Sequence, residues 1–551
     1  MKCTECDKEI PAGSVFCPIC GSAQFEETVE SVVQPEPVEE DVEAKEEPIA
    51  EVPEKLRMKA RKQWWILAAC LVLVVAALVL FAGHRPGFGF YTTASGLFLS
   101  DLSGSEPLKL ADDGYYAGLV MTENQDHIFY RAWKNGQPPG LYHVDLRDLS
   151  KEPEKLAENV GQFYVNARGT RMAYIRDGNL YVYNRKSETL VAEDVAQFLC
   201  DEAMDTFAYA TFAQVGDAFA LTKKWYVKDG SAEPKVVGED GFVEILSLPA
   251  DGKPLIFSVD GKFYAYKDNE DILIAENATL TSGVYEDGSF YYKKLNDEEQ
   301  FICCYFDGKR SVEITNAQNV SEDFGAQPIL HWQDKSSGRY FVAVRGHVME
   351  IPLEQIVDIA LSEDEKTLCV TAGDENGKLS LYTASIFWGK LGKMRQLARD
   401  AESIWTWFVG KKLYYRSVES GGLGTLYCNG KEIQQGVRGA LRVHEETGTV
   451  LVWGEESSDN QAAVYMVRNG KSVKLMDKVG YTSGNLEFTS NGGVLLRTNV
   501  TGQISDLWYF DRSGKGTKLD KYVKGMHPVE KPHRPGSQIY WGLGSALLGG
   551  I

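Results

Sequence analysis

The 551-residue chain offers few side chains in the arrangements that carry catalysis. It contains no G-x-S-x-G nucleophile elbow, no H-E-x-x-H metal motif and no P-loop, which disfavours a fused serine peptidase and the chemistries of the other two motifs. Its eight histidines are scattered, and no two share the spacing of ligands on one helix face, so we expect surface or core positions for them. No catalytic residue is therefore proposed, and we expect a protein that is not an enzyme.

An excess of positive charge is also missing. The chain has 58 Lys and Arg against 78 Asp and Glu, a net charge of −20. Residues 1–63 hold eight basic and fifteen acidic residues, a net of −7, so the remaining residues carry −13. Because binding to a nucleic acid backbone depends on basic residues, no nucleic-acid partner is expected.

Cysteine is scarce, yet four of the ten cysteines fall within the first 20 residues. Cys3 and Cys6 form one C-x-x-C turn, and Cys17 and Cys20 form a second, so each turn presents two sulfurs to one ion. Four thiolates complete a tetrahedral site that suits Zn²⁺ and leaves no coordination position open. The spacing predicts one structural zinc ion, whose binding would supply the folding energy of a module too small to fold alone.

This stretch resembles the short zinc-ribbon family found at the N-termini of many bacterial membrane proteins. The resemblance covers residues 3–21 and includes the four cysteines with Ile10, Pro11, Gly13, Phe16, Pro18 and Gly21. Asp7 departs from the glycine that the family often has there. The ribbon, taken as residues 1–25, lacks a basic face, so we expect it to contact a cytosolic protein.

Residues 26–54 contain twelve acidic residues and one basic residue, Lys45, and no aromatic residue. Such a segment repels itself and buries little, which predicts an extended linker; an acidic partner-binding tail is the alternative.

Residues 55–83 combine a basic flank with an apolar run. No charged residue occurs from Trp64 to Ala82, and 19 helical residues rise about 28 Å, close to the hydrocarbon thickness of a bilayer. Five basic residues precede the run and only Arg85 follows it closely. The positive-inside rule then predicts an uncleaved signal anchor in the plasma membrane, with a cytoplasmic N-terminus and an extracytoplasmic C-terminal part.

The remaining sequence repeats. Strand-like segments with an aromatic second or third residue recur through it, each followed by a polar turn and a second strand. The aromatic anchors are Phe98, Tyr142, Tyr181, Tyr226, Tyr264, Tyr427, Tyr465 and Trp508, with weaker copies near Cys303, Met349 and Ser380. Eleven anchors over about 410 residues, with a further alternating segment between each pair, predict units of four short strands.

Units of this kind resemble the blades of TolB-like and WD-type β-propellers of bacterial surface proteins. Propellers usually have four to eight blades. Eleven units therefore favour two tandem rings, residues 84–335 and 336–551, with one irregular ring as the alternative. The first strand begins in the middle of a blade, so a later strand is expected to complete that blade and close a ring.

Smaller features of this part have plain structural interpretations. The acidic stretches at 268 and 374 do not match a full EF-hand loop and are expected to be hairpin turns. Cys200, Cys303, Cys304, Cys369 and Cys428 are odd in number and are expected to be buried free thiols. Trp405 and Trp407 fit either strand core or an exposed ligand-binding surface.

The sequence thus predicts a mainly β, single-pass surface protein. Its function is expected to be binding: a scaffold or sensor whose propeller engages a protein or glycan outside. The alternative is a propeller-based extracellular hydrolase or lyase, which a pocket holding two or more carboxylates would favour.

Overall fold

The computed structural model describes residues 87–528 and Pro532, with gaps at 113–115, 134–137, 216–217, 238–242, 249–253, 268–269, 286, 317–327, 420, 458–460, 481–484 and 502–503. The chain divides into residues 1–83 and residues 84–551, and only the second unit contains described residues. The four cysteines of the predicted zinc site, the acidic linker and the predicted span at 64–82 lie outside the described residues. Within the described part, no helix is long and apolar enough to cross a membrane.

The described chain consists of short antiparallel strands grouped into eleven sheets, which we call blades 1 to 11. The strands of blades 1 to 4 are β1 (Gly89–Thr93), β2 (Gly96–Ser100), β3 (Leu108–Ala111), β4 (Tyr116–Met121), β5 (His127–Ala132), β6 (Gly140–Asp145), β7 (Glu154–Ala157), β8 (Val160–Val165), β9 (Met172–Arg176), β10 (Asn179–Tyr183), β11 (Glu188–Ala192), β12 (Val195–Cys200), β13 (Thr206–Val215), β14 (Ala218–Asp229) and β15 (Lys235–Val237).

Blades 5 to 8 follow the same antiparallel order. Their strands are β16 (Val243–Ser247), β17 (Leu255–Val259), β18 (Lys262–Lys267), β19 (Glu270–Ala275), β20 (Ala278–Leu280), β21 (Phe290–Leu295), β22 (Phe301–Phe306), β23 (Ser311–Asn316), β24 (Ile329–Gln333), β25 (Tyr340–Val344), β26 (His347–Ile351), β27 (Ile356–Leu361), β28 (Thr367–Gly373), β29 (Leu379–Phe387), β30 (Lys390–Leu391) and β31 (Arg395–Ala401).

Blades 9 to 11 complete the series, and one short 3-10 helix, η2 (Glu445–Thr447), follows β36. The strands are β32 (Ser403–Val409), β33 (Lys412–Val418), β34 (Gly424–Cys428), β35 (Lys431–Val437), β36 (Gly439–His444), β37 (Thr449–Ser457), β38 (Gln461–Arg468), β39 (Lys471–Gly480), β40 (Leu486–Phe488), β41 (Val494–Thr501), β42 (Ile504–Phe510), β43 (Gly516–Val523) and β44 (Gly525–Met526). Blade 7 has three described strands, β24 to β26, and blade 1 takes β44 as its fourth.

The predicted aromatic anchors occupy equivalent positions. Ten of the eleven anchors, including weaker copies, lie on the next-to-outermost strand of a blade, and Met349 lies on β26, the last strand of the three described in blade 7. In six blades the anchor ring stacks or tilts against an aromatic ring directly opposite it on the neighbouring strand, as Tyr226 does on Tyr209 with centroids 5.4 Å apart. Cross-strand aromatic pairs stabilise a sheet, so the repeat marks one blade each time.

The hydrophobic core is divided among the seams between blades. Eleven clusters of buried residues are described, and each joins side chains of two successive blades. The last of them joins blade 11 to blade 1 through Leu495, Leu507 and Tyr91. At the same seam, β44 pairs with β1, with Met526 opposite Tyr91.

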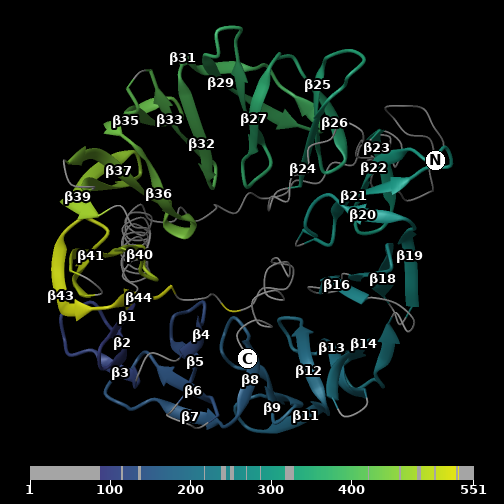
Figure 1. The fold of residues 1–551 in the computed structure, drawn as a ribbon, viewed down its shortest axis with the longest axis vertical. Coiled ribbons are helices and arrows are strands. Elements are labelled where there is room, and N and C mark those ends of the chain that lie inside the picture. The colour runs from purple at the N-terminus through teal and green to yellow at the C-terminus, as the bar shows by residue number, and fades with distance from the viewer. Residues whose placement is uncertain are drawn as a thin grey trace, which may run out of the picture. The chain divides into compact units, whose positions relative to one another are not determined.

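These contacts close one ring of eleven blades, as Figure 1 shows. The expectation of two tandem rings divided near residue 336 was wrong, because Ile329 of blade 7 and Leu368 of blade 8 share one cluster across that boundary. The alternative of one irregular ring is correct, and so is the expectation that a late strand completes the first blade. That strand is β44.

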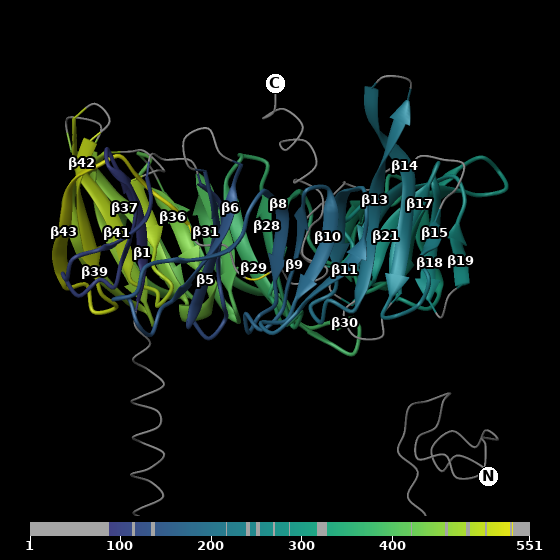
Figure 2. The ribbon, with the colours of Figure 1, turned by 90° about the horizontal axis from the view of Figure 1, so that it is seen from below.

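One face of the ring carries the turn that follows the first strand in blades 2 to 6 and 8 to 11, and the β25–β26 turn of blade 7, whose Arg345 contacts Asp287 and Glu365. We call it the entry face, because the described chain begins there at Gly87 and Phe88. Contacts on this face link blades 11, 1, 2, 3 and 4 in one series and blades 7, 8 and 9 in another. In these contacts Phe88 N donates to Ser490 Oγ (3.3 Å), Gln125 Nε2 to Ser490 O (3.1 Å), Glu123 N to Ala167 O (2.9 Å), Arg171 Nη1 to Asp205 Oδ1 (2.8 Å), Arg345 Nη2 to Glu365 Oε1 (2.6 Å) and Gly410 N to Glu363 Oε1 (2.8 Å). The ring is seen edge-on in Figure 2.

Candidate functional site

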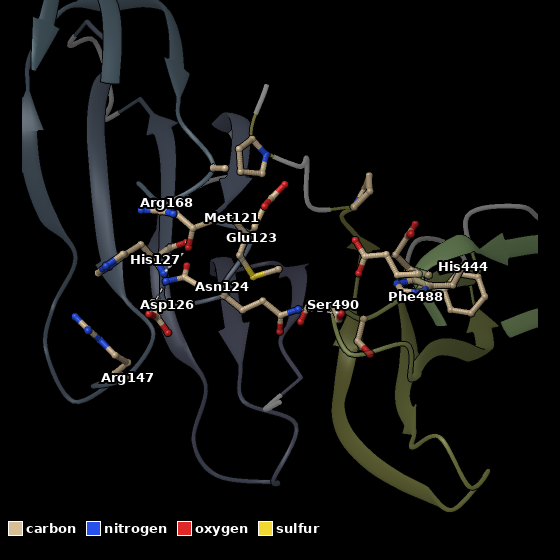
Figure 3. Close-up of a pocket in the computed structure, with 18 of the residues that line it drawn as sticks. Met121, Glu123, Asn124, Asp126, His127, Arg147, Arg168, His444, Phe488 and Ser490 are labelled. Carbon is tan, nitrogen blue, oxygen red and sulfur yellow. Dashed lines mark hydrogen bonds between the residues drawn. The ribbon is translucent and has the colours of Figure 1, made fainter. Parts of the chain in front are cut away.

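A cavity of about 1130 Å³ opens between blades 2 and 3 on one side and blades 10 and 11 on the other. Blade 1 lies between these pairs, and its inner strand β44 has only two residues, which leaves room there. The walls come mainly from turns of the entry face, together with Pro528 and Pro532. Figure 3 shows the two walls, with Asp126 and His127 on one and His444 and Phe488 on the other.

The β4–β5 turn, Thr122–Asp126, builds the centre of the first wall. Thr122 closes it, because its amide donates to His127 O (3.0 Å) and its hydroxyl accepts from His127 N (3.1 Å). Gln125 takes a left-handed φ of 59° inside the turn, and its side-chain amide bonds to Ser490 O of blade 11. The turn is thereby fixed from both ends and joined to the opposite wall.

Behind this turn, the side chains of His127, His143 and Glu154 contact one another in a row. His143 Nε2 lies 3.1 Å from His127 Nδ1, and His143 Nδ1 lies 3.3 Å from Glu154 Oε2. His127 is buried, and burial together with the nearby positive charge of Arg185 lowers its pKa to about 4. His127 is therefore neutral near pH 7. In the cavity wall it can form hydrogen bonds but carries no positive charge.

Three arginines stand around the same wall. Arg147 pairs with Asp145 through two hydrogen bonds of 2.8 and 2.7 Å, which holds the pKa of Asp145 far below its usual range. Arg185 Nε donates to Gly169 O at 2.9 Å. Arg168 is exposed on the cavity wall and has no hydrogen-bond or ion-pair partner among the described residues. Its guanidinium is thus open to a ligand.

The second wall is narrower and mixes charge with an aromatic surface. Arg442 Nη1 lies 2.5 Å from Glu487 Oε2, so these two charges compensate each other. The His444 ring meets Phe488 edge-on, with centroids 5.2 Å apart, and its Nδ1 lies 3.0 Å from Thr447 Oγ1. This wall therefore offers aromatic rings beside the Arg442–Glu487 salt bridge.

The cavity as a whole is polar and evenly charged. Four arginines and four carboxylates line it, the latter being Glu123, Asp126, Glu446 and Glu487. Such a lining can donate and accept many hydrogen bonds at once, as a site for a polar ligand requires. In the described part of the chain, no group of three or more His, Cys, Asp or Glu side chains could hold a metal ion.

Several predicted residues can be located. The zinc ligands Cys3, Cys6, Cys17 and Cys20 lie outside the described residues, so the zinc site stays a prediction. Asp374 forms a hairpin turn, in which its carboxylate accepts from the amides of Asn376 and Lys378. The five propeller cysteines form no disulfide among the described residues, and all are buried except Cys428, which is half-buried. Trp405 is 66% exposed, whereas Trp407 is half-buried and stacks on Tyr414.

Sequence reasoning missed the cavity and the contact between His127 and His143. The histidines are 16 residues apart, far from any helical ligand spacing. Pairing of β5 with β6 places His127 opposite Asp145 and Phe129 opposite His143, so the two imidazoles are diagonal neighbours. The contact between the two histidines could have been found from the sequence only by pairing β5 with β6 in the correct register. The cavity has no such signal, because its turns come from four blades.

No family model and no curated protein matches the chain. Solved structures do match it, among them a crystal structure of the eukaryotic initiation factor, with 10% identity and a TM-score of 0.38 over 81% of this chain and 98% of that one. Oligogalacturonate lyase in complex with manganese matches with 11% identity and a TM-score of 0.28 over 78% and 98%. The β-propeller domain of the Trilobed protease from Pyrococcus furiosus matches with 12% identity and a TM-score of 0.23 over 66% and 98%. Likeness at this level carries no argument about function, and the chain itself is an eleven-bladed β-propeller by its own sheets and seams.

Proposed function

We propose that the protein is a membrane-anchored binding protein, a scaffold or sensor, whose propeller holds a polar ligand in the cavity of the entry face. The observation that carries this proposal is the cavity lining: turns of four blades converge on it, and Gln125 ties the two walls together. A site built from turns of a rigid ring is well placed to bind without changing shape.

The ligand that the lining fits best bears a carboxylate among hydroxyl or amide groups, as acidic oligosaccharides and acidic peptides do. Arg168 lies on the wall with no ion-pair partner among the described residues, and guanidinium–carboxylate pairs are strong and directional. The neutral His127 offers hydrogen bonding, and the ring of Phe488 on the opposite wall offers an aromatic contact.

The proposal is tested with the full chain in nanodiscs, using calorimetry against a panel of acidic oligosaccharides and acidic peptides. Arg168→Ala is expected to weaken binding of the best ligand about tenfold or more, since charged hydrogen bonds contribute about 1.5–3 kcal/mol. Arg399→Ala, at an exposed arginine of blade 8, is the matched control and should leave binding unchanged. Equal loss in both variants, or no binding in the panel, would count against the site.

A hydrolase or lyase is the second candidate, because the cavity does hold more than two carboxylates. Glu487 pairs with Arg442, and Asp126 accepts from Asn124 Nδ2 at 2.6 Å. Glu123 and Glu446 also line the cavity, and a carboxylate there could transfer a proton to or from a bound ligand. Incubation with the bound ligand should return it intact if the protein only binds. Cleavage that Glu123→Gln or Glu446→Gln abolishes would establish the enzyme instead.

Anchoring by residues 64–82 is the other half of the proposal. Five basic residues before the apolar run favour a cytoplasmic N-terminus. Protease added to intact spheroplasts is expected to digest the propeller and spare a tag at Met1, and loss of that tag with an intact propeller would reverse the topology. The cytosolic ribbon would then hold one Zn²⁺ and contact a protein partner inside the cell.

A further inference from the structure

A hairpin on blade 8 presents two large aromatic side chains to solvent. Strand β29 extends beyond its blade and pairs with the two-residue strand β30, Ile386 opposite Leu391 and Phe387 opposite Lys390. Trp388 and Gly389 form the turn, with left-handed φ values of 51° and 66°. Phe387 is 71% exposed and Trp388 85%, the highest values among the large hydrophobic side chains described.

The residues around this tip are basic. From Asn376 to Arg399 the chain has five Lys or Arg and no acidic residue, although the protein as a whole carries −20. Lys390 and Lys393 are exposed on the hairpin and have no ion-pair partner among the described residues. Aromatic rings at the tip with lysines beside them match a surface that is apolar just below a layer of negative charge.

The hairpin lies on the entry face. Ile386 N donates to Lys366 O, in the β27–β28 turn, at 2.7 Å. The same turn supplies Glu365, which holds Arg345, and Glu363, which accepts from Gly410. The β27–β28 turn follows the first strand of blade 8 and so lies on the entry face, as does Phe88, where the described chain begins. Figure 2 shows β30 at the lower edge of the ring.

The length of the chain limits how far this face can lie from a bilayer. The predicted span ends at Ala82, and Gly87 follows five residues later, a distance of at most about 18 Å when fully extended. With the proposed anchor, so short a connection would keep the entry face, and the aromatic hairpin on it, near the bilayer.

We propose that the Phe387–Trp388 hairpin inserts into the interface of an anionic bilayer and forms a second attachment of the ring beside its tether. The inference rests on the proposed membrane anchor. Phe387 and Trp388 would enter the region between headgroups and acyl chains, while Lys390 and Lys393 contact anionic headgroups. Because blade 8 is remote from blade 1 around the ring, two attachments would hold the entry face against the membrane (Figure 1).

The test uses the full chain in proteoliposomes, with a photo-crosslinking benzoylphenylalanine at position 388. The matched control carries the same group at position 405, where Trp405 is also exposed but lies on the innermost strand of blade 9. After irradiation, lipid adducts at position 388 are expected to exceed those at 405 at least about fivefold. They should fall at least about threefold in vesicles of phosphatidylcholine alone compared with vesicles containing phosphatidylglycerol, and likewise in the K390E/K393E variant.

Flotation of the unmodified chain after alkaline extraction is measured in parallel. A chain that does not float with the vesicles would overturn both the anchor and the hairpin proposal. A chain that floats but gives no excess of lipid adducts at position 388, or gives protein adducts there instead, would overturn the hairpin proposal alone.

Discussion

His127 acquires its acid–base behaviour from neighbours that the sequence does not place beside it. The imidazole is buried between blades 2 and 3 near Arg185, and a charged form would lose hydration and meet a like charge. Its pKa is about 4 in the folded protein, against 6.5 for an unperturbed histidine. Between these two values the unfolded chain binds a proton that the folded chain does not.

This difference predicts a pH dependence of stability with a definite sign. The contribution of a neutral His127 is fully present above pH 6.5 and is lost as the pH falls toward 4, amounting to about 3 kcal/mol in all. His127→Gln should therefore flatten the fall of the unfolding midpoint between pH 7 and 4.5, measured by thermal scans at fixed ionic strength. The exposed His347→Gln is the control and should leave the slope as it is; an unchanged slope in His127→Gln would contradict the assignment.

Strand β44 has only two residues, as β30 does, yet it completes the sheet of blade 1. Its two residues pair with β1, and His527 continues the pairing by donating its amide to Phe90 O at 3.1 Å. The strand covers the seam in which Tyr91, Leu495 and Val523 are buried.

Deletion of residues 525–551 is expected to open blade 1, because an unpaired edge of β1 and the buried side chains of the seam become exposed. Limited proteolysis should then cut first within residues 87–111, and the unfolding midpoint should fall. Deletion of residues 533–551 removes no described residue and serves as the control. Equal resistance of the two truncated proteins would show that β44 does not close the ring.

The four ribbon cysteines predict a small module at the N-terminus whose folding depends on a bound metal ion. The full chain should bind one Zn²⁺, and Cys17→Ser should release it, because three thiolates hold the ion less tightly than four and the module cannot fold without it. Elemental analysis of the purified protein measures the stoichiometry. Retention of one zinc ion by the variant would contradict the predicted ligand set.

Much of the element-level structure was accessible from the sequence. The spacing of aromatic anchors predicted eleven four-stranded units, and a strand such as β10 shows why: Tyr181 must face Tyr174 for the hairpin to pack. The number of rings was not accessible, since it depends on the angle between blades. Seam side chains such as Leu330 and Ala343 set that angle, and they have no local signature. The cavity escaped prediction because Gln125 and Ser490 meet across 365 residues.

At the scale of the molecule, stability is distributed over a closed circle of seams. Leu495 is 1% exposed at the last seam, and Leu495→Ala should cost about 2–5 kcal/mol through lost burial and a cavity. Amide exchange should rise first in blades 1 and 11 together, as followed by mass spectrometry. Leu330→Ala, at the seam of blades 6 and 7, is the matched variant. In that variant amide exchange should rise first in blades 6 and 7. Independent unfolding of residues 87–335 and 336–528 as two transitions would contradict the single ring.

The position of β1 between β2 and β44 has a mechanical consequence. A force applied to the chain at Gly87 enters the ring along the axis of β1, which is registered over five residue pairs with β2 and two with β44. Such a load shears both sets of hydrogen bonds simultaneously and does not peel them apart one at a time. The ring therefore resists extraction through its N-terminal strand, and the first blade acts as a clamp on any tension between the propeller and whatever holds residue 87.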